Sequence, residues 1–243
     1  MAARSSLTSR RKTELTWLGH SAFKIVSPGG KTILIDPWLD NPKAPPGAED
    51  IAKVDLILVT HGHSDHLGKT IELTRRTGAR VFAIHEVSLY LKSRGVTAAQ
   101  GMNKGGTISS DGIRVTMVDA KHSADISEDG KTIPGGEAAG FVIELENGLK
   151  IYHAGDTALF LDMKLIAQLY KPDTVLLPIG DLYTMGPKEA ALACEWLHPK
   201  RIIGMHYGTF PALTGTPDEL RKCLKPNLRK RLIVLTPGSC TTL

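Results

Sequence analysis

The chain contains 243 residues, of which 42% are hydrophobic and 23% are charged, and its formal net charge is +5. This length fits one domain with a sizeable core, and no apolar run approaches the length of a membrane span. The three cysteines, Cys194, Cys223 and Cys240, are widely spaced and odd in number, which argues against a disulfide framework. We therefore expect a cytoplasmic protein that does not act at a membrane.

The positive charge permits an anionic small-molecule substrate. We do not expect nucleic-acid binding, because the basic residues are dispersed apart from the N-terminus and Arg221–Arg231, with few aromatic residues among them. The N-terminus is rich in basic residues and in Ser and Thr, but it lacks the apolar segment of a secretory signal. We predict a disordered basic tail over residues 1–13 and a single domain over residues 14–243. Whether this domain forms a homo-oligomer is left open.

The domain opens with a predicted meander of three short strands, Glu14–Leu18, Phe23–Val26 and Lys31–Asp36. His20 lies between the first two strands and is polar in an apolar stretch. It is either a core histidine with a backbone partner or a group near the functional site. Pro37–Lys53 is Pro-rich and has no periodicity, so we expect a long loop that forms a rim or lid.

A cluster of metal-binding side chains follows the next predicted strand. Leu56–Val59 is too apolar and too short for an exposed helix, which favours a buried strand, and a helix is expected from Lys69 to Arg76. The intervening turn, Thr60–Gly68, holds four side chains that bind Zn²⁺, Mn²⁺ or Fe: His61, His63, Asp65 and His66.

The arrangement of this cluster favours catalysis. His61 and His63 are two residues apart and can point the same way, whereas Asp65 and His66 follow a change of direction and can serve a second ion. Structural zinc sites usually contain cysteine, and none is near. The alternative, a His-rich surface loop, fits poorly because the cluster is enclosed by a strand and a helix.

The pattern His61-x-His63-x-Asp65-His66 resembles the metallo-β-lactamase superfamily of binuclear metal hydrolases. The stretch Trp17–Phe23 also resembles the start of its compact metal-dependent hydrolase branch (the UPF0173 type), which is related to sugar-lactonase and phosphodiesterase-like members. The resemblance implies an α/β fold, a four-layer αββα sandwich of two mixed β-sheets with helices outside and metals at one edge.

The next predicted elements are a strand at Arg80–Ile84, a helix at Glu86–Arg94 and a strand at Ile113–Asp119. His122 lies just beyond the last of these strands, and the resemblance implies that it is the third ligand of the first ion. Ala124–Ala139 is rich in Gly and acidic residues, so we expect a flexible loop near the substrate.

A hairpin is predicted from Phe141–Leu145 and Leu149–Tyr152, because Asn147-Gly148 is a favoured turn. Asp156 follows in a Gly-Asp-Thr sequence that resembles a superfamily motif, which implies a carboxylate bridging two ions. A helix N-cap is the alternative for Asp156. The role of His153 is left open.

The C-terminal part is predicted to continue the alternation of strands and helices. The expected elements are an amphipathic segment at Leu159–Leu169, a strand at Thr174–Leu177, a helix at Lys188–Trp196 after Pro187, a strand at Arg201–Met205, a helix at Asp218–Leu224 and a final strand at Leu232–Leu235. Residues 178–187 either line a pocket or only turn the backbone. His206 matches the last ligand of the family, and we interpret His85 and His198 as structural.

The resemblance implies two divalent ions, one held by His61, His63 and His122, the other by Asp65, His66 and His206, with Asp156 between them. Ions about 3.5–4 Å apart can share a hydroxide that attacks a carbonyl or phosphorus atom, and no Ser, Cys or Lys nucleophile is needed. Asp65 is also a candidate catalytic group that orients the nucleophile, and His20 is a second candidate. Zinc is the expected metal, with Mn and Fe left open.

The predicted function is hydrolysis of an ester, lactone or phosphodiester bond in a small molecule. Two alternatives remain open. The first is an Fe-containing redox or oxygen-chemistry protein of the same fold, which would need a flavin domain or partner. The second is a metal-binding protein without catalytic activity.

Overall fold

The first sheet forms from the short apolar runs of the N-terminal half. The computed structural model describes residues 12–243. The sheet has the order β15-β1-β2-β3-β4-β5-β6, and its strands are β1 (Glu14–Trp17), β2 (Phe23–Val26), β3 (Thr32–Ile35), β4 (Leu56–Val59), β5 (Arg80–Ile84), β6 (Ala99–Met102) and β15 (Cys240–Thr242). The strands from β1 to β3 are antiparallel and those from β3 to β6 are parallel.

The second sheet has the order β14-β13-β12-β11-β8-β7. Its strands are β7 (Thr107–Ser110), β8 (Ile113–Asp119), β11 (Ala139–Glu144), β12 (Lys150–His153), β13 (Thr174–Pro178) and β14 (Arg201–Met205). Pairing is antiparallel from β7 to β12 and parallel from β12 to β14. Both sheets are therefore mixed, as the family resemblance implied.

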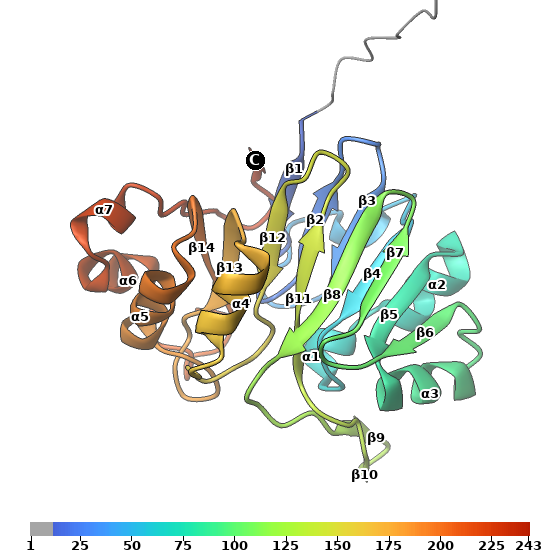
Figure 1. Ribbon diagram of the computed structural model, residues 1–243. Coiled ribbons are helices and arrows are strands. Elements are labelled where there is room, and N and C mark those ends of the chain that lie inside the picture. The colour runs from blue at the N-terminus through green and yellow to red at the C-terminus, as the bar shows by residue number, and fades with distance from the viewer. Residues whose placement is uncertain (1–11) are drawn as a thin grey trace, which may run out of the picture.

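Helices cover the outer sides of the two sheets (Figure 1). The helical elements within residues 12–243 are the 3₁₀ turn η1 (Ala48–Asp50) and the α-helices α1 (Ser64–Leu67), α2 (Thr70–Thr77), α3 (His85–Ser93), α4 (Met163–Tyr170), α5 (Pro187–Leu197), α6 (Pro217–Cys223) and α7 (Pro226–Arg229). Of these, α1 lies at the ends of the strands and not on an outer side (Figure 1). Local signals set their starts: Pro187 occupies the first turn of α5, and Thr216 and Glu219 form a capping box on α6. Within residues 12–243, no helix is long and apolar enough to cross a membrane.

Strand periodicity divides the core into two layers. Successive side chains of a strand point to opposite faces, so Leu176 of β13 joins the cluster between the sheets, whereas Val175 and Leu177 join the cluster beneath α4, α5 and α6. The same alternation places Ile203 between the sheets and Ile202 under the helices. The predicted four-layer αββα sandwich is confirmed by this arrangement.

The predicted final strand at Leu232–Leu235 is wrong. Only Leu232 bridges to Ile202 of β14, and the turn at Pro237-Gly238 then carries the chain across to the first sheet. There Cys240–Thr242 forms β15 and pairs with β1.

The edge strands β6 and β7 were missed because their sequences, AQGM and TISS, carry little apolar pattern.

The segment Ala124–Ala139 is not an irregular loop throughout. It contains the hairpin of β9 (Ile126–Glu128) and β10 (Lys131–Ile133), which projects at the bottom of Figure 1. Both ends of the segment are buried, at Ala124 and Ala138. The small apolar residues at its ends fix it to the sandwich despite its Gly-rich and acidic composition.

Most of the predicted tail, residues 1–11, lies outside the described residues. Thr13 is buried, and its carbonyl accepts a hydrogen bond from the amide of Leu243 at 3.0 Å. The two ends of the described chain therefore meet at the edge formed by β1 and β15.

Candidate metal centre

The carboxyl ends of seven strands meet at one edge of the sandwich. β1, β3 and β4 run in the same direction in the first sheet, as do β8, β12, β13 and β14 in the second. Backbone hydrogen bonds join the two sheets at this edge, from the His206 amide to the His20 carbonyl (3.0 Å) and from the Ala139 amide to the Thr60 carbonyl (3.1 Å). These backbone hydrogen bonds thus hold together residues that are distant in sequence.

All seven predicted ligands lie at this edge, in three overlapping groups. Within each group the candidate ligand atoms lie within 4.8 Å of one another, and the groups are His61, His63 and His122; His20, Asp65, His66 and His206; and His61, His66 and Asp156. Oδ2 of Asp156 is 2.9 Å from Nε2 of His206 and 3.7 Å from Nε2 of His122. Asp156 therefore reaches the predicted ligands of both ions.

The donor set fits divalent cations. Oδ1 of Asp156 and Nε2 of His66 are buried, and neither has a hydrogen-bond partner among residues 12–243. Buried polar atoms normally have partners, so unpaired ones at the centre of a carboxylate and imidazole cluster indicate a place for a cation. Nitrogen and oxygen donors without thiolate suit zinc, manganese or iron.

The electrostatics of the cluster balance carboxylates against imidazoles. Burial alone would raise the pKa of Asp156, but His206 and His66 hold it well below its usual value. Burial alone would lower the pKa of His66, but Asp156 and Asp36 raise it well above the usual value. Burial lowers the pKa of His61, His63 and His122, so these imidazoles are neutral and have lone pairs available.

Asp36 is a central residue of the site that sequence reasoning missed. It is fully buried just beyond β3, and its Oδ2 accepts hydrogen bonds from Nδ1 of His66 (2.7 Å) and from the hydroxyl of Thr60 (2.7 Å). Because that hydroxyl donates to Asp36, it accepts from Nδ1 of His61 at 3.0 Å. Asp36 and Thr60 thus leave Nε2 of both histidines facing the centre. A carboxylate directly after an apolar strand was the available signal.

His20 is fully buried in the site and is linked to Asp65. A carboxylate only accepts, so Nε2–H of His20 donates to Oδ2 of Asp65 (3.0 Å), and Nδ1 accepts from the hydroxyl of Thr209 (2.9 Å). Burial lowers the pKa of His20 to about 4 despite this hydrogen bond, so the ring is neutral at neutral pH. Burial opposes ionisation of Asp65, but the hydrogen bond from His20 keeps its pKa low.

The remaining histidines have structural positions. Nε2 of His153 donates to the carbonyl of Ser21 (3.0 Å), and its Nδ1 accepts from the amide of Gly155 (3.1 Å). His153 thereby fixes the turn that carries Asp156. His85 and His198 are exposed, at the start of α3 and the end of α5.

The backbone around the centre adopts unusual conformations. His20, Asp36 and His206 all have positive φ, at 51°, 46° and 55°. Such values strain non-glycine residues, and they occur preferentially at functional sites. Gly155 (φ 64°) precedes Asp156, and a Cβ there would lie 2.5 Å from the carbonyl oxygen of Ala139. Only glycine fits that position.

A cavity of about 310 Å³ opens onto the cluster. It is lined by His63, Asp65, His122, Ser123, Asp156, Tyr183, His206 and Phe210. Tyr183 comes from the segment 178–187, whose sequence left open whether it lines a pocket. The predicted lid Pro37–Lys53 supplies none of the lining residues, although its Trp38 stacks on Phe210.

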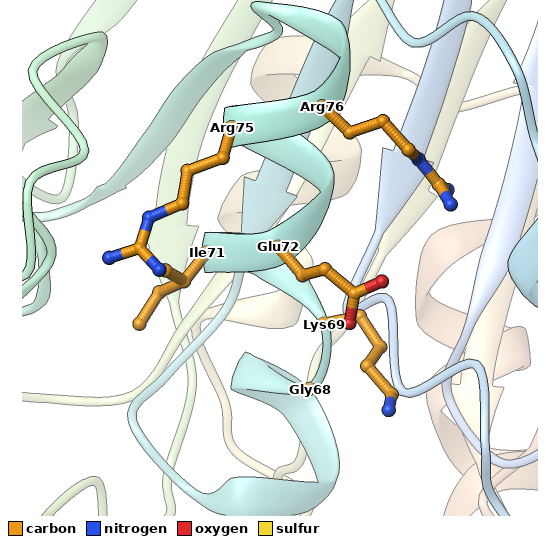
Figure 2. A pocket seen from close by; sticks show the side chains of 6 residues that line it. All are labelled: Gly68, Lys69, Ile71, Glu72, Arg75 and Arg76. Atoms are coloured by element: carbon orange, nitrogen blue, oxygen red, sulfur yellow. The ribbon is translucent and has the colours of Figure 1, made fainter.

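A larger and shallower hollow, of about 540 Å³, lies along α2 away from the cluster. The side chains that line it project from both sides of the helix (Figure 2). Its basic groups already have partners. Lys69 pairs with Asp40 and Glu49, Arg76 donates to the carbonyls of Glu49 and Ile51, and Arg75 donates to the carbonyl of Arg94. The smaller cavity, which opens onto the cluster, is therefore the candidate functional cavity.

Two facing mixed sheets, outer helices and a His/Asp cluster at the joined edge define the metallo-β-lactamase fold. Residues 14–206 match the family model described as the Beta-lactamase superfamily domain. The chain belongs to this superfamily and, within it, to the UPF0173 metal-dependent hydrolases, as its relatives show.

One such relative is the UPF0173 metal-dependent hydrolase of Rubrobacter xylanophilus, which is 49% identical over 229 residues, covering 93% of this chain and 95% of the relative. Another, from Methanosarcina barkeri, is 50% identical over 226 residues, covering 93% and 96%. Among solved structures, the metallo hydrolase Igni18 of Ignicoccus hospitalis superposes with a TM-score of 0.86 at 37% identity, covering 96% of this chain and 99% of Igni18.

Proposed function

We propose that the protein holds two divalent metal ions and uses them to hydrolyse an ester, lactone or phosphodiester bond in a small molecule. The observation that carries this proposal is the position of Asp156, which groups with His61 and His66, one predicted ligand of each ion. Membership in a family of metal-dependent hydrolases supports it. Three free cysteines fit a reducing cytoplasm as the place of action.

The ligand set would comprise His61, His63 and His122 for one ion, Asp65, His66 and His206 for the other, and Asp156 for both. Bound divalent ions make water nucleophilic near neutral pH and neutralise charge on the attacked group. Zinc suits these donors, and Mn and Fe also fit them.

The surrounding residues fix the geometry of this set. Asp36 and Thr60 orient His61 and His66 through their Nδ1 atoms. The proton on Nε2 of His20 holds Oδ2 of Asp65, which lies 3.7 Å from Nε2 of His66 and 4.0 Å from Nε2 of His206. Asp65 is thereby positioned at the floor of the cavity, where it orients the nucleophile or accepts its proton.

The test is hydrolysis by full-length protein reconstituted separately with Zn²⁺ and Mn²⁺, on a panel of phosphodiesters, lactones, esters and thioesters. Asp156→Asn should lower kcat/KM by at least about 100-fold, because it removes the shared charge. Asp162→Asn, an exposed aspartate outside the cavity, is the matched control and should leave the rate unchanged. Circular dichroism establishes that both variants fold.

An unchanged rate in folded Asp156→Asn on every substrate that the wild type hydrolyses would overturn the proposal. Metal analysis together with a visible absorption spectrum addresses the iron alternative. A protein that retains iron through purification and shows iron-dependent absorption would favour redox chemistry, whereas bound zinc without such absorption supports hydrolysis.

A further inference from the structure

The cavity has a polar floor and an apolar mouth. Its lining consists of His, Asp and Ser side chains together with two aromatic rings, those of Tyr183 and Phe210. Within the described residues 12–243, no lysine or arginine lines it. Lys121, which adjoins His122 in the sequence, is exposed and paired with Asp119. A charged substituent of a substrate would therefore find no cationic side chain in the cavity wall.

Tyr183 is held at the mouth by a strained turn. Its two predecessors, Asp181 and Leu182, have positive φ of 67° and 55°, which is rare for successive non-glycine residues. The Asp181 side chain accepts a hydrogen bond from the Leu182 amide at 2.7 Å, and the Met185 amide donates to the carbonyl of Thr157 at 2.9 Å. The turn is thus fixed beside Asp156, although Tyr183 is 61% exposed.

Phe210 is held by a separate set of contacts. Its ring stacks on Trp38 with centroids 5.9 Å apart, and it meets the edge of His20 at 6.0 Å. The preceding residue, Thr209, is hydrogen-bonded to His20. Phe210 nevertheless remains 41% exposed. An exposed tyrosine that follows a strained turn and an exposed phenylalanine that stacks on Trp38 indicate a surface that a ligand covers.

We infer that the substrate is an uncharged ester with an aromatic or similarly apolar substituent, which packs against Tyr183 and Phe210 while the ester group lies over Asp65 and Asp156. This inference rests on the proposed function. Water adds across the ester C–O bond, so the acyl carbon gains a hydroxyl group and the alcohol oxygen gains a proton. The released products are a carboxylic acid and an apolar alcohol.

The test compares esters that share a reacting group. Zinc-reconstituted full-length protein is assayed with methyl acetate, benzyl acetate and monobenzyl succinate, of which the last adds a carboxylate. We expect kcat/KM to be at least about tenfold higher for benzyl acetate than for methyl acetate, because the ring becomes buried. Monobenzyl succinate should be a poorer substrate than benzyl acetate.

Variants of Tyr183 and Phe210 test whether these two side chains cause the preference for the benzyl ester. Tyr183→Ala and Phe210→Ala should each lower the ratio of benzyl to methyl rates severalfold, whereas Tyr183→Phe, which keeps the ring, should retain it. Leu169→Ala is the control, since Leu169 is 67% exposed on α4 and lies outside the cavity lining. Equal rates on the two acetates, or a preference for the anionic ester, would overturn the inference while leaving the proposed function intact.

A binding measurement separates this inference from catalysis. Ligand-observed NMR with benzyl alcohol should detect binding to the wild type and to Leu169→Ala, and much weaker binding to a Tyr183→Ala/Phe210→Ala double variant. If the protein hydrolysed a lactone or a phosphodiester of the panel but no ester, the inference of an ester substrate would fail and the proposed function would stand. If it hydrolysed no substrate of the panel, the proposed function would fail, and this measurement would still show whether Tyr183 and Phe210 bind an apolar ligand. Equal binding by the wild type and the double variant would overturn it.

Discussion

The two halves of the candidate centre are built differently. The group of His61, His63 and His122 consists of imidazoles alone, and two of them are partly exposed to the cavity. The group around His66 and His206 is buried almost completely and is balanced by three carboxylates, those of Asp36, Asp65 and Asp156. In the first half His63 and His122 are accessible while His61 is buried, whereas the second half is part of the folded core.

The largest difference between the two halves is expected in the free energy of unfolding, when one histidine of each half is replaced in turn. In protein stripped of metal by a chelator, His66→Ala removes the imidazole that both buried carboxylates, Asp36 and Asp156, contact, and it should lower the free energy of unfolding by about 3–5 kcal/mol. His63→Ala, at a partly exposed position, should lower it by no more than about 1 kcal/mol. Chemical denaturation measures both, and equal losses would contradict the distinction.

A pH effect should also arise from the buried half. The pKa of His20 falls from 6.5 to about 4 on folding, so the native state binds fewer protons than the unfolded state between these values. Stability of the metal-free protein is then fully present above pH 6.5 and declines as pH falls toward 4, by up to about 3 kcal/mol.

His20→Asn tests whether His20 causes this pH dependence of stability, since asparagine tolerates the positive φ at this position. The variant should reduce the slope of unfolding free energy between pH 4 and 6.5 by the share of one histidine, while His61, His63 and His122, whose pKa values burial also lowers, keep their shares. His198→Asn, which changes an exposed histidine that also has positive φ, serves as the control and should keep the slope. A slope unchanged in His20→Asn would assign it to other groups.

A smaller effect is expected from changing Asp36, which is linked to both halves. It binds His66 directly, and it binds Thr60, which in turn binds His61. Asp36→Asn should weaken zinc binding by about 10–100-fold, because it disturbs the orientation of His61 and His66. Competition with a chromophoric chelator measures the affinity. Asp55→Asn changes an aspartate that binds the Thr32 amide at the opposite end of β3, and it should leave zinc affinity unchanged.

The same contrast explains how much of the site could be predicted. The contiguous ligands from His61 to His66 are readable because their spacing is itself a motif. His122, Asp156 and His206 are single residues after strands, and they were identified only through the family resemblance. Asp36 was missed because it is a lone aspartate at the end of a predicted strand, and its contacts with Thr60 and His66 depend on how the strands pack.

The fold was predicted where the apolar pattern is strong. The bounds of β5, β8 and β14 match their predicted ranges, because buried runs with clear ends determine such strands. The pattern failed at Leu232–Leu235, where an apolar run makes only one bridge to Ile202. Local apolar character cannot indicate whether a neighbouring strand is available for pairing.

The central claim is that seven residues from both sheets hold two ions that share Asp156. Anomalous diffraction from crystals grown with zinc tests it directly. We expect two peaks, one among His61, His63 and His122 and the other among Asp65, His66 and His206, with Asp156 contacting both. A single peak, or zinc bound away from this edge of the sandwich, would contradict it.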